Sequence, residues 1–226
     1  NMKKIIQLFI LLTVIVSCKN ETPEGWIDEE RLMSKTTKDW VSLGGNYKQQ
    51  HYSHLDRINS VNIKDVGFAW EYDARSPIGR VPRGLEATPF VVDGIMYTSG
   101  AWGFVYAINA KTGDEIWKYD PKVDASFNRR ACCDVVNRGV AVWKGKVYVG
   151  TLDGYLVSLN AKNGQEIWRV NTLADRSLAY TITGPPQVAG DVVIIGNSGA
   201  EFGVRGYITA YHLKSGEQKW RFFTVP

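Results

Sequence analysis

A repeat with a period of 51 or 52 residues runs through this chain and limits the folds that it can adopt. Its three copies, 107–117, 158–168 and 210–220, keep a small residue, a Lys, a Gly and a Trp in register. A period of this length that contains several short apolar runs is typical of β-propellers, in which each copy forms one four-stranded blade. Chance similarity is a poor alternative, because four residue types hold their spacing three times.

The strands of each blade are located by their turns. In the first copy we expect strands at 87–92, 95–99 and 103–109, and a fourth that ends near Trp117. The first hairpin turns are Asp93-Gly94, Lys144-Gly145 and Gly190-Asp191. A lone outer strand with Trp70, from a blade completed elsewhere, is expected at 67–72. The prediction is an all-β chain with about three blades, whose repeated Trp residues pack between neighbouring blades as scaffold.

Two loops break the period. The hairpin Gly and the Gly that opens the third strand are 9 residues apart in two copies and 16 apart in the third, so seven residues are inserted near 198–203. The longest connection between copies contains Cys132-Cys133. Because chain direction alternates along a blade, both kinds of loop emerge on one face. Repeat proteins carry insertions on the binding face, so we expect the functional site there.

The N-terminal segment is typical of an exported protein. Lys3 and Lys4 precede an apolar run at 5–16, which is too short to span a bilayer and suits a signal peptide. The run ends in a sequence that resembles the lipobox of bacterial lipoproteins, in which the Cys, here Cys18, is acylated. A plain cleaved signal is the alternative.

We therefore expect three regions: a signal peptide and lipobox at 1–18, an N-terminal linker at 19–38 and a partial propeller at 39–226. The predicted location is the periplasm, with membrane contact only through a lipid on Cys18. Nucleic acid is not an expected partner, because the net charge of +4 is small and the basic residues are scattered. A nicotinamide cofactor is not expected either, since no phosphate-binding Gly-rich motif precedes a helix.

Cys132 and Cys133 are the sharpest chemical feature of the long connection. Adjacent cysteines can bond only by closing an eight-membered ring, with Cα atoms closer than in ordinary disulfides. Such strain favours a reducible bond and indicates a function. The alternative is two reduced cysteines packed as small hydrophobic residues. Export to an oxidising compartment favours the disulfide.

Several charged and polar residues lie in the same set of loops. Glu201 and Ser198 belong to the inserted loop, and a carboxylate on such a loop suits a hard cation, although an exposed Glu is usually only solvated. Glu86 directly precedes an apolar strand. Arg138 and Thr183 fall in the connections that enter the second and third copies.

From Asp39 to the C-terminus, the chain resembles the pyrroloquinoline quinone (PQQ) dependent alcohol dehydrogenases, an eight-bladed periplasmic family. The resemblance rests on the adjacent cysteines, an Arg six residues after the first of them, and a Thr fifteen residues before a Ser-Gly-Ala-Glu loop. It implies a Cys132–Cys133 disulfide over the quinone plane. The other implied cofactor contacts are Glu86, Arg138, Thr183, Ser198, Gly199 and Ala200. Glu201 matches a ligand of Ca²⁺ or a lanthanide.

The resemblance also implies a reaction. The metal polarises a quinone carbonyl, and a carboxylate base takes the alcohol proton while hydride passes to the quinone. A primary alcohol would become an aldehyde, and electrons would pass to a cytochrome c or a quinone. The family's catalytic Asp, its Asn metal ligand and its floor Trp lie downstream of the Ser-Gly-Ala-Glu loop. We therefore expect them after Pro226, and expect 19–226 alone to be inactive.

Two other functions remain open at this point. Outer-membrane assembly lipoproteins share the lipobox, the propeller and the Trp repeats, but bind no cofactor. PQQ-dependent sugar dehydrogenases share the cofactor, although glucose-type members generally lack adjacent cysteines. The cysteine pair, Arg138 at its spacing and the 198–201 loop favour the alcohol dehydrogenases over both.

Overall fold

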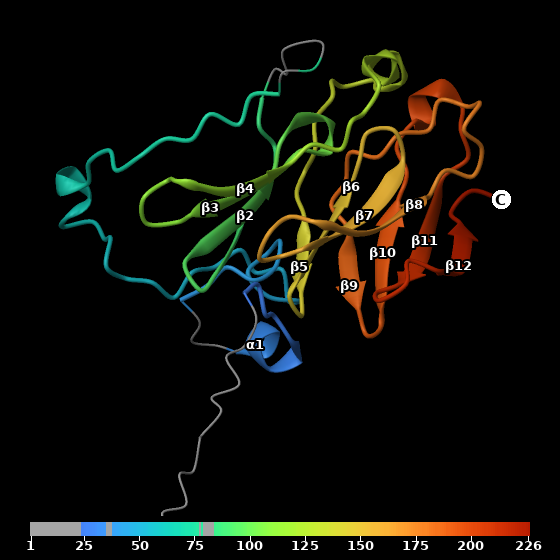
Figure 1. The fold of residues 1–226 in the computed structure, drawn as a ribbon. Coiled ribbons are helices and arrows are strands. Elements are labelled where there is room, and N and C mark those ends of the chain that lie inside the picture. Colours follow the sequence, from blue (N-terminus) through green and yellow to red (C-terminus); the bar gives the residue numbers. More distant parts are fainter. Residues whose placement is uncertain (1–23, 35–37, 77, 79–83) are drawn as a thin grey trace, which may run out of the picture.

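The computed structural model describes residues 24–34, 38–76, 78 and 84–226. The strands in these ranges form three four-stranded antiparallel sheets that lie side by side as blades (Figure 1). The first blade contains β1 (Phe90–Val92), β2 (Ile95–Ser99), β3 (Val105–Asn109) and β4 (Glu115–Tyr119). The second contains β5 (Ala141–Trp143), β6 (Lys146–Gly150), β7 (Tyr155–Asn160) and β8 (Glu166–Asn171). The third contains β9 (Gln187–Ala189), β10 (Val192–Gly196), β11 (Tyr207–His212) and β12 (Gln218–Phe223).

The hairpins at the start of each blade form as the turn residues predict. Asp93 and Gly94 join β1 to β2 with φ of 52° and 78°, and Lys144 and Gly145 join β5 to β6 with φ of 45° and 76°. Two successive residues with positive φ match the right-handed twist of the flanking strands, so this turn suits a tight hairpin. The predicted four-stranded units are therefore confirmed.

The repeated Trp residues pack between blades, as predicted, where a neighbouring blade lies beside them. Trp117 on β4 is 8% exposed, and its Nε1 donates to the Ala161 carbonyl of the second blade at 2.9 Å. Trp168 on β8 donates in the same way to Leu213 of the third blade at 3.2 Å. Trp220 on β12 is 42% exposed.

The outer strand predicted at 67–72, as part of a blade completed elsewhere, remains a prediction. These residues form no ladder in the described structure. An outer strand needs a third strand to exchange backbone hydrogen bonds with, and the described residues before 67 contain no strand. Trp70 nevertheless packs against Gly113, and the Tyr72 hydroxyl donates to the Glu115 carboxylate beside β4.

The described part of the predicted linker is folded onto the blades. Ile27 and Leu32 are buried in the main core, and the Ile27 carbonyl accepts from the Lys144 backbone N–H at 2.9 Å. Leu32 belongs to the short helix α1 (Glu29–Met33). These apolar side chains cover one end of the core, which explains why the stretch is ordered. The predicted signal segment and Cys18 lie outside the described residues.

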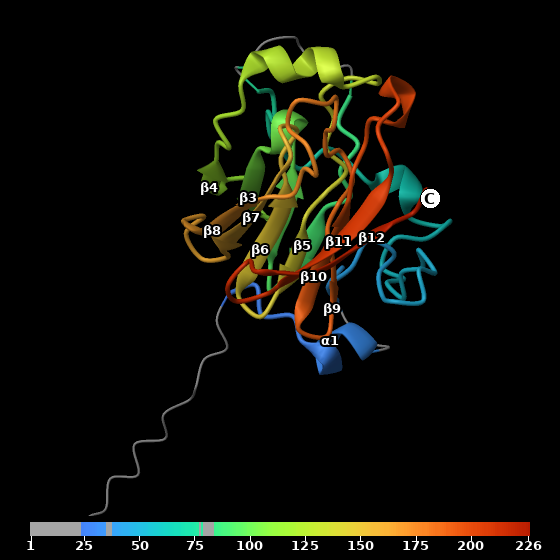
Figure 2. The ribbon, with the colours of Figure 1, turned by 90° about the vertical axis from the view of Figure 1, so that its right-hand side faces the viewer.

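Four short 3₁₀ helices complete the described elements: η1 (Ile63–Asp65), η2 (Ala101–Gly103), η3 (Ala125–Arg130) and η4 (Ala200–Phe202). Figure 2 shows η3 and η4 at one end of the blades and α1 at the opposite end. η3 lies in the long connection between blades, and η4 in the inserted loop, so both irregular loops share a face. Within the described ranges, no helix has the length and apolar character needed to cross a bilayer.

Candidate functional site

The two irregular loops line one cleft of about 330 Å³. It is lined by the adjacent cysteines and Arg138 from the β4–β5 connection, by Thr183 from the β8–β9 connection, and by 198–201 from the β10–β11 loop. Loops that belong to different blades therefore meet at one place. All the predicted site residues except Glu86 line this cleft, and Glu86 reaches its edge through an ion pair with Arg138.

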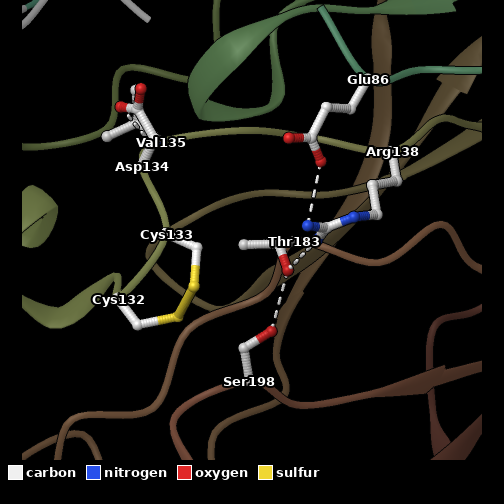
Figure 3. Close-up of a disulfide and its surroundings, with 8 residues drawn as sticks. All are labelled: Glu86, Cys132, Cys133, Asp134, Val135, Arg138, Thr183 and Ser198. Carbon is white, nitrogen blue, oxygen red and sulfur yellow. Dashed lines mark hydrogen bonds and ion pairs between the residues drawn. A yellow bond between two sulfur atoms is a disulfide. The ribbon is translucent and has the colours of Figure 1, made fainter. Parts of the chain in front are cut away.

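Arg138 is the centre of a polar network in this cleft (Figure 3). Its Nη2 lies 2.9 Å from Oε2 of Glu86, and its Nη1 donates to Oγ1 of Thr183 at 2.7 Å. The Thr183 and Ser198 hydroxyl oxygens are 2.9 Å apart. The Arg138 side chain is 43% exposed, so the guanidinium is oriented by protein groups while part of it stays open to the cleft.

Backbone hydrogen bonds fix these loops to one another. The Arg138 N–H donates to the Thr183 carbonyl at 3.0 Å. Thr181 and Ser198 exchange two backbone hydrogen bonds, of 2.8 and 3.2 Å, as an isolated bridge. The polar side chains are thus preorganised by the scaffold rather than by their own contacts alone.

Asn137 is a residue that the sequence reasoning missed. Its side chain is buried, and its Oδ1 accepts from the Ser99 hydroxyl at 2.6 Å and from the Gly139 N–H at 3.1 Å. Its Nδ2 donates to the Gly150 carbonyl at 2.7 Å. These bonds join the ends of β2 and β6 and hold the chain immediately before Arg138. The sequence carries no signal for this role except the position beside Arg138.

Cys132 and Cys133 are joined by a disulfide in the structure, with Cα atoms 3.8 Å apart. Both residues are exposed at the cleft. Figure 3 shows the two sulfur atoms on the side of the cleft facing Thr183 and Ser198. An exposed disulfide presents an apolar surface without donors, which suits contact with the face of a flat ligand.

The segment that carries the disulfide is held by the first blade. Trp102, in the β2–β3 loop, is fully buried with a φ of 68°. Its backbone N–H donates to the Val135 carbonyl at 2.8 Å. Phe127 and Ala131 pack against the same apolar cluster. Asp124 caps η3, and its hydrogen bond from the Ser126 N–H lowers the pKa of the Asp124 carboxyl. Trp102 was not among the residues predicted for the site, although it is the one Trp of the first copy that does not occupy the repeated position of Trp117.

Glu201 lies on η4, between two glycines with positive φ. A Cβ on Gly199, where φ is 119°, would lie 2.4 Å from the Ala179 carbonyl oxygen, so only glycine fits this close approach. A carboxylate oxygen of Glu201 and the two sulfur atoms lie within 4.8 Å of one another. The inserted loop therefore holds a carboxylate at the cleft, beside the disulfide.

The chemistry of this donor set points to an anionic, flat ligand and a cation. A guanidinium with free N–H groups binds carboxylates in a bidentate manner, and two hydroxyls beside it can donate or accept. The Glu201 carboxylate is an oxygen ligand of the kind that Ca²⁺ and similar hard ions prefer. The disulfide covers one side of the space between them.

Comparison with known proteins identifies a family that matches most of the chain. A family model described as "PQQ: Glucose/ethanol/alcohol dehydrogenase, beta-propeller domain" matches residues 40–226. The chain is 54% identical over 196 residues to a quinohemoprotein alcohol dehydrogenase from Comamonas testosteroni, covering 87% of this chain and 27% of the relative. It is 50% identical over 173 residues to a 1-butanol dehydrogenase (cytochrome c) from Thauera butanivorans, covering 76% of this chain and 24% of that protein.

Solved structures agree with the sequence relatives. The crystal structure of the Comamonas testosteroni enzyme matches with a TM-score of 0.83 and 51% identity, over 89% of this chain and 30% of that one. A europium-containing methanol dehydrogenase matches with a TM-score of 0.75 and 38% identity, over 82% of this chain and 32% of that one. The predicted propeller fold is confirmed. The chain spans less than a third of the length of each of these relatives.

Proposed function

Because this chain belongs to the β-propeller family of PQQ glucose, ethanol and alcohol dehydrogenases, we propose that its cleft forms part of the cofactor site of an alcohol-oxidising quinoprotein. The observation that carries the proposal is the meeting of the disulfide with the Arg138–Thr183–Ser198 network in one cleft. Relatives with 54% and 50% identity are named alcohol dehydrogenases, which favours an alcohol over a sugar as substrate.

The residues of the cleft fit PQQ, a flat quinone that carries carboxylates. Arg138 would bind a carboxylate through its free guanidinium N–H groups, and the Thr183 and Ser198 hydroxyls would bind polar atoms at the ligand's edge. Gly199, which has no side chain, and Ala200, which has only a methyl group, leave space at that edge. A cleft of about 330 Å³ is within the range of small-molecule sites. Bound PQQ supplies the two-electron acceptor for alcohol oxidation, which no amino-acid side chain provides.

Glu86 and the disulfide have different tasks in this proposal. Glu86 pairs with Arg138 and so keeps the positively charged guanidinium group directed at the cleft. The Cys132–Cys133 disulfide covers the ligand's face and excludes water from it, since its sulfur atoms make no strong hydrogen bonds with solvent. The backbone bond from the Trp102 N–H to the Val135 carbonyl holds the segment that carries the disulfide, independently of any ligand.

Glu201 is the proposed metal ligand. Its carboxylate oxygen suits Ca²⁺ or a lanthanide, both of which prefer oxygen ligands. A cation held there would also attract the anionic ligand and polarise a carbonyl beside it. The europium in the name of one structural relative makes a lanthanide a reasonable ion to test alongside Ca²⁺.

We infer a primary alcohol as substrate and a cytochrome c as electron acceptor, since the Thauera butanivorans relative is named for both 1-butanol and cytochrome c. The signal-like N-terminus supports a periplasmic protein, with a lipid anchor if Cys18 is acylated.

Binding of PQQ to Arg138 variants tests the proposal. Arg138→Ala removes a charge-assisted contact worth about 1.5–3 kcal/mol, so PQQ binding should weaken roughly tenfold to a hundredfold in equilibrium dialysis with Ca²⁺ present. Arg138→Lys should be intermediate, because lysine cannot bind a carboxylate through two parallel N–H groups. The matched control is Arg129→Ala, an exposed arginine of the same connection that does not line the cleft. Equal PQQ affinity of Arg138→Ala and the unaltered chain would contradict the proposal.

A further inference from the structure

Three potential metal ligands of mixed chemistry meet at the cleft. The sulfur atoms of Cys132 and Cys133 and a carboxylate oxygen of Glu201 lie within 4.8 Å of one another. They form the single group of this kind in the part of the chain that the structure describes, and all three residues are exposed. An ion in solution therefore has access to them.

The oxidation state of the sulfur atoms decides what this group can bind. A disulfide is a poor metal ligand, so in the oxidised chain the group offers only a carboxylate oxygen. A phosphine reductant and one water molecule convert the disulfide into two thiols, and the phosphine leaves as its oxide. Exposed disulfides are the ones that reductants reach, and both cysteines are exposed here. Two adjacent thiols and a carboxylate then face the same space.

We propose that the reduced chain binds one soft divalent cation, of the class of Zn²⁺ and Cd²⁺, through Cys132, Cys133 and Glu201. Each thiol loses its proton when the ion binds, so two thiolates and one carboxylate surround the metal. Water fills the fourth tetrahedral position. Thiolate ligands select soft ions, whereas the oxidised site with its single carboxylate selects hard ones.

The loops can bring the three ligands to the distances that such an ion needs. Zn–S distances of about 2.3 Å and Zn–O distances of about 2.1 Å put tetrahedral ligands roughly 3.5–3.8 Å apart. The two sulfur atoms move apart once the disulfide is reduced, whereas the Glu201 oxygen lies within 4.8 Å of them, so an approach of up to about 1 Å by this oxygen is required. η4 can provide it, because Gly199 and Gly203 flank it and the Cβ position of Gly203 meets nothing within 4 Å.

This inference goes beyond the proposed function and does not depend on PQQ. The sulfur atoms are either joined to each other or free to bind the ion, so the disulfide and the soft-ion site exclude one another.

Cadmium binding without PQQ tests the inference. The chain carries Cys18→Ser, so that Cys132 and Cys133 are its only cysteines, and is measured before and after treatment with a phosphine. We expect about one Cd²⁺ per reduced chain, seen as thiolate-to-cadmium absorbance and by equilibrium dialysis, and no such absorbance in the oxidised chain. Cys133→Ser should lower the Cd²⁺ affinity at least a hundredfold, because it removes one of the two thiolates.

Glu201→Gln tests the third ligand. It should weaken Cd²⁺ binding roughly tenfold while the thiolate absorbance remains at saturation. Glu217→Gln, an exposed Glu in the β11–β12 turn, is the matched control and should leave the affinity unchanged. Near-ultraviolet circular dichroism checks that each variant keeps the fold. Equal Cd²⁺ binding by oxidised and reduced chains, or by Glu201→Gln and the parent, would overturn the inference, whatever the outcome of the PQQ experiment.

Discussion

The turn glycines of the repeat serve the neighbouring blade as well as their own turn. Gly164 ends the turn between β7 and β8 with a φ of 69°, and a Cβ there would lie 2.6 Å from the Trp117 ring. Gly216 stands in the same relation to Trp168, at 2.9 Å. The glycine therefore allows the turn conformation and also leaves the space into which the preceding blade's Trp packs.

Gly164→Ala should destabilise the fold more than an alanine at an equivalent turn conformation with free space. Gly190→Ala is the control, because Gly190 has a φ of 60° and its Cβ position meets nothing within 4 Å. Both substitutions force alanine into a left-handed conformation, at about 1–2 kcal/mol. Gly164→Ala adds the overpacking against Trp117, roughly 1–3 kcal/mol more. Free energies of unfolding in urea measure the difference, and equal losses would refute the packing role.

At the scale of elements, α1 depends on contacts outside itself. Five residues are too few for an isolated helix to be stable. Arg31 connects the helix to the blades through its Nη2, which lies 2.5 Å from a carboxylate oxygen of Asp39 and 2.5 Å from one of Asp93. Asp28 caps the N-terminus by accepting from the Arg31 N–H at 3.0 Å. The predicted linker therefore becomes an element only in contact with the β1–β2 hairpin.

Removal of the Asp28 side chain should lower the free energy of unfolding by an amount that depends on pH. The hydrogen bond from the Arg31 N–H lowers the pKa of the Asp28 carboxyl. Because the folded-state pKa is below the unfolded one, the carboxylate stabilises the fold above the unfolded pKa, and this contribution is lost as pH falls through the folded pKa. Asp28→Ala should cost about 1 kcal/mol at neutral pH and less in acid.

Asp28→Asn is the matched control for the cap, since asparagine also accepts the hydrogen bond and should retain most of the stability. Urea unfolding at neutral and acidic pH gives both comparisons. A loss for Asp28→Ala that is the same at both pH values would show that the charge of the cap contributes nothing.

At the scale of the whole molecule, the same contacts recur between each pair of neighbouring blades. Arg169 and Arg221 each follow a docking Trp, and each donates to a carbonyl of the preceding blade's exit loop. The distances are 3.0 Å from Arg169 to Pro121 and 2.6 Å from Arg221 to Thr172. In the first blade the residue after the docking Trp117 is Lys118, and its ammonium group lies over the Phe104 ring. Cohesion of the blades is therefore a sum of nearest-neighbour contacts, as in other repeat proteins.

Trp117→Phe and Trp220→Phe should separate blade cohesion from the local role of a Trp. Trp117→Phe removes one of the two donors to the buried Ala161 carbonyl and leaves the Tyr97 hydroxyl as the other, so it should lower the free energy of unfolding by about 0.5–1.5 kcal/mol. Trp220 is 42% exposed, and its replacement should change stability by less than about 0.5 kcal/mol. Thermal unfolding of the two variants measures this contrast. Similar losses would mean that docking between blades does not account for the effect of Trp117.

The blades themselves were predictable because their signals are local and repeated. Hairpin turns such as Asp93-Gly94 restrict the backbone directly, and a Trp that recurs with the period must meet the same environment each time. At 67–72 the sequence predicts an outer strand whose blade is completed elsewhere, and these residues form no ladder in the described structure. A strand exists only with a hydrogen-bonding partner, and the residues of the strand alone do not reveal whether one is present.

The blade period and the loops that share a face follow from the sequence, because strand direction alternates with the order of elements alone. The pairing of Arg138 with Glu86, the support of the cleft by Asn137 and Trp102, and the meeting of Glu201 with the disulfide follow from the packing of the folded chain. These contacts join residues of different blades, and their distances depend on how the sheets pack. No local periodicity encodes that packing, so the residues of the site could be proposed from the sequence but their contacts could not.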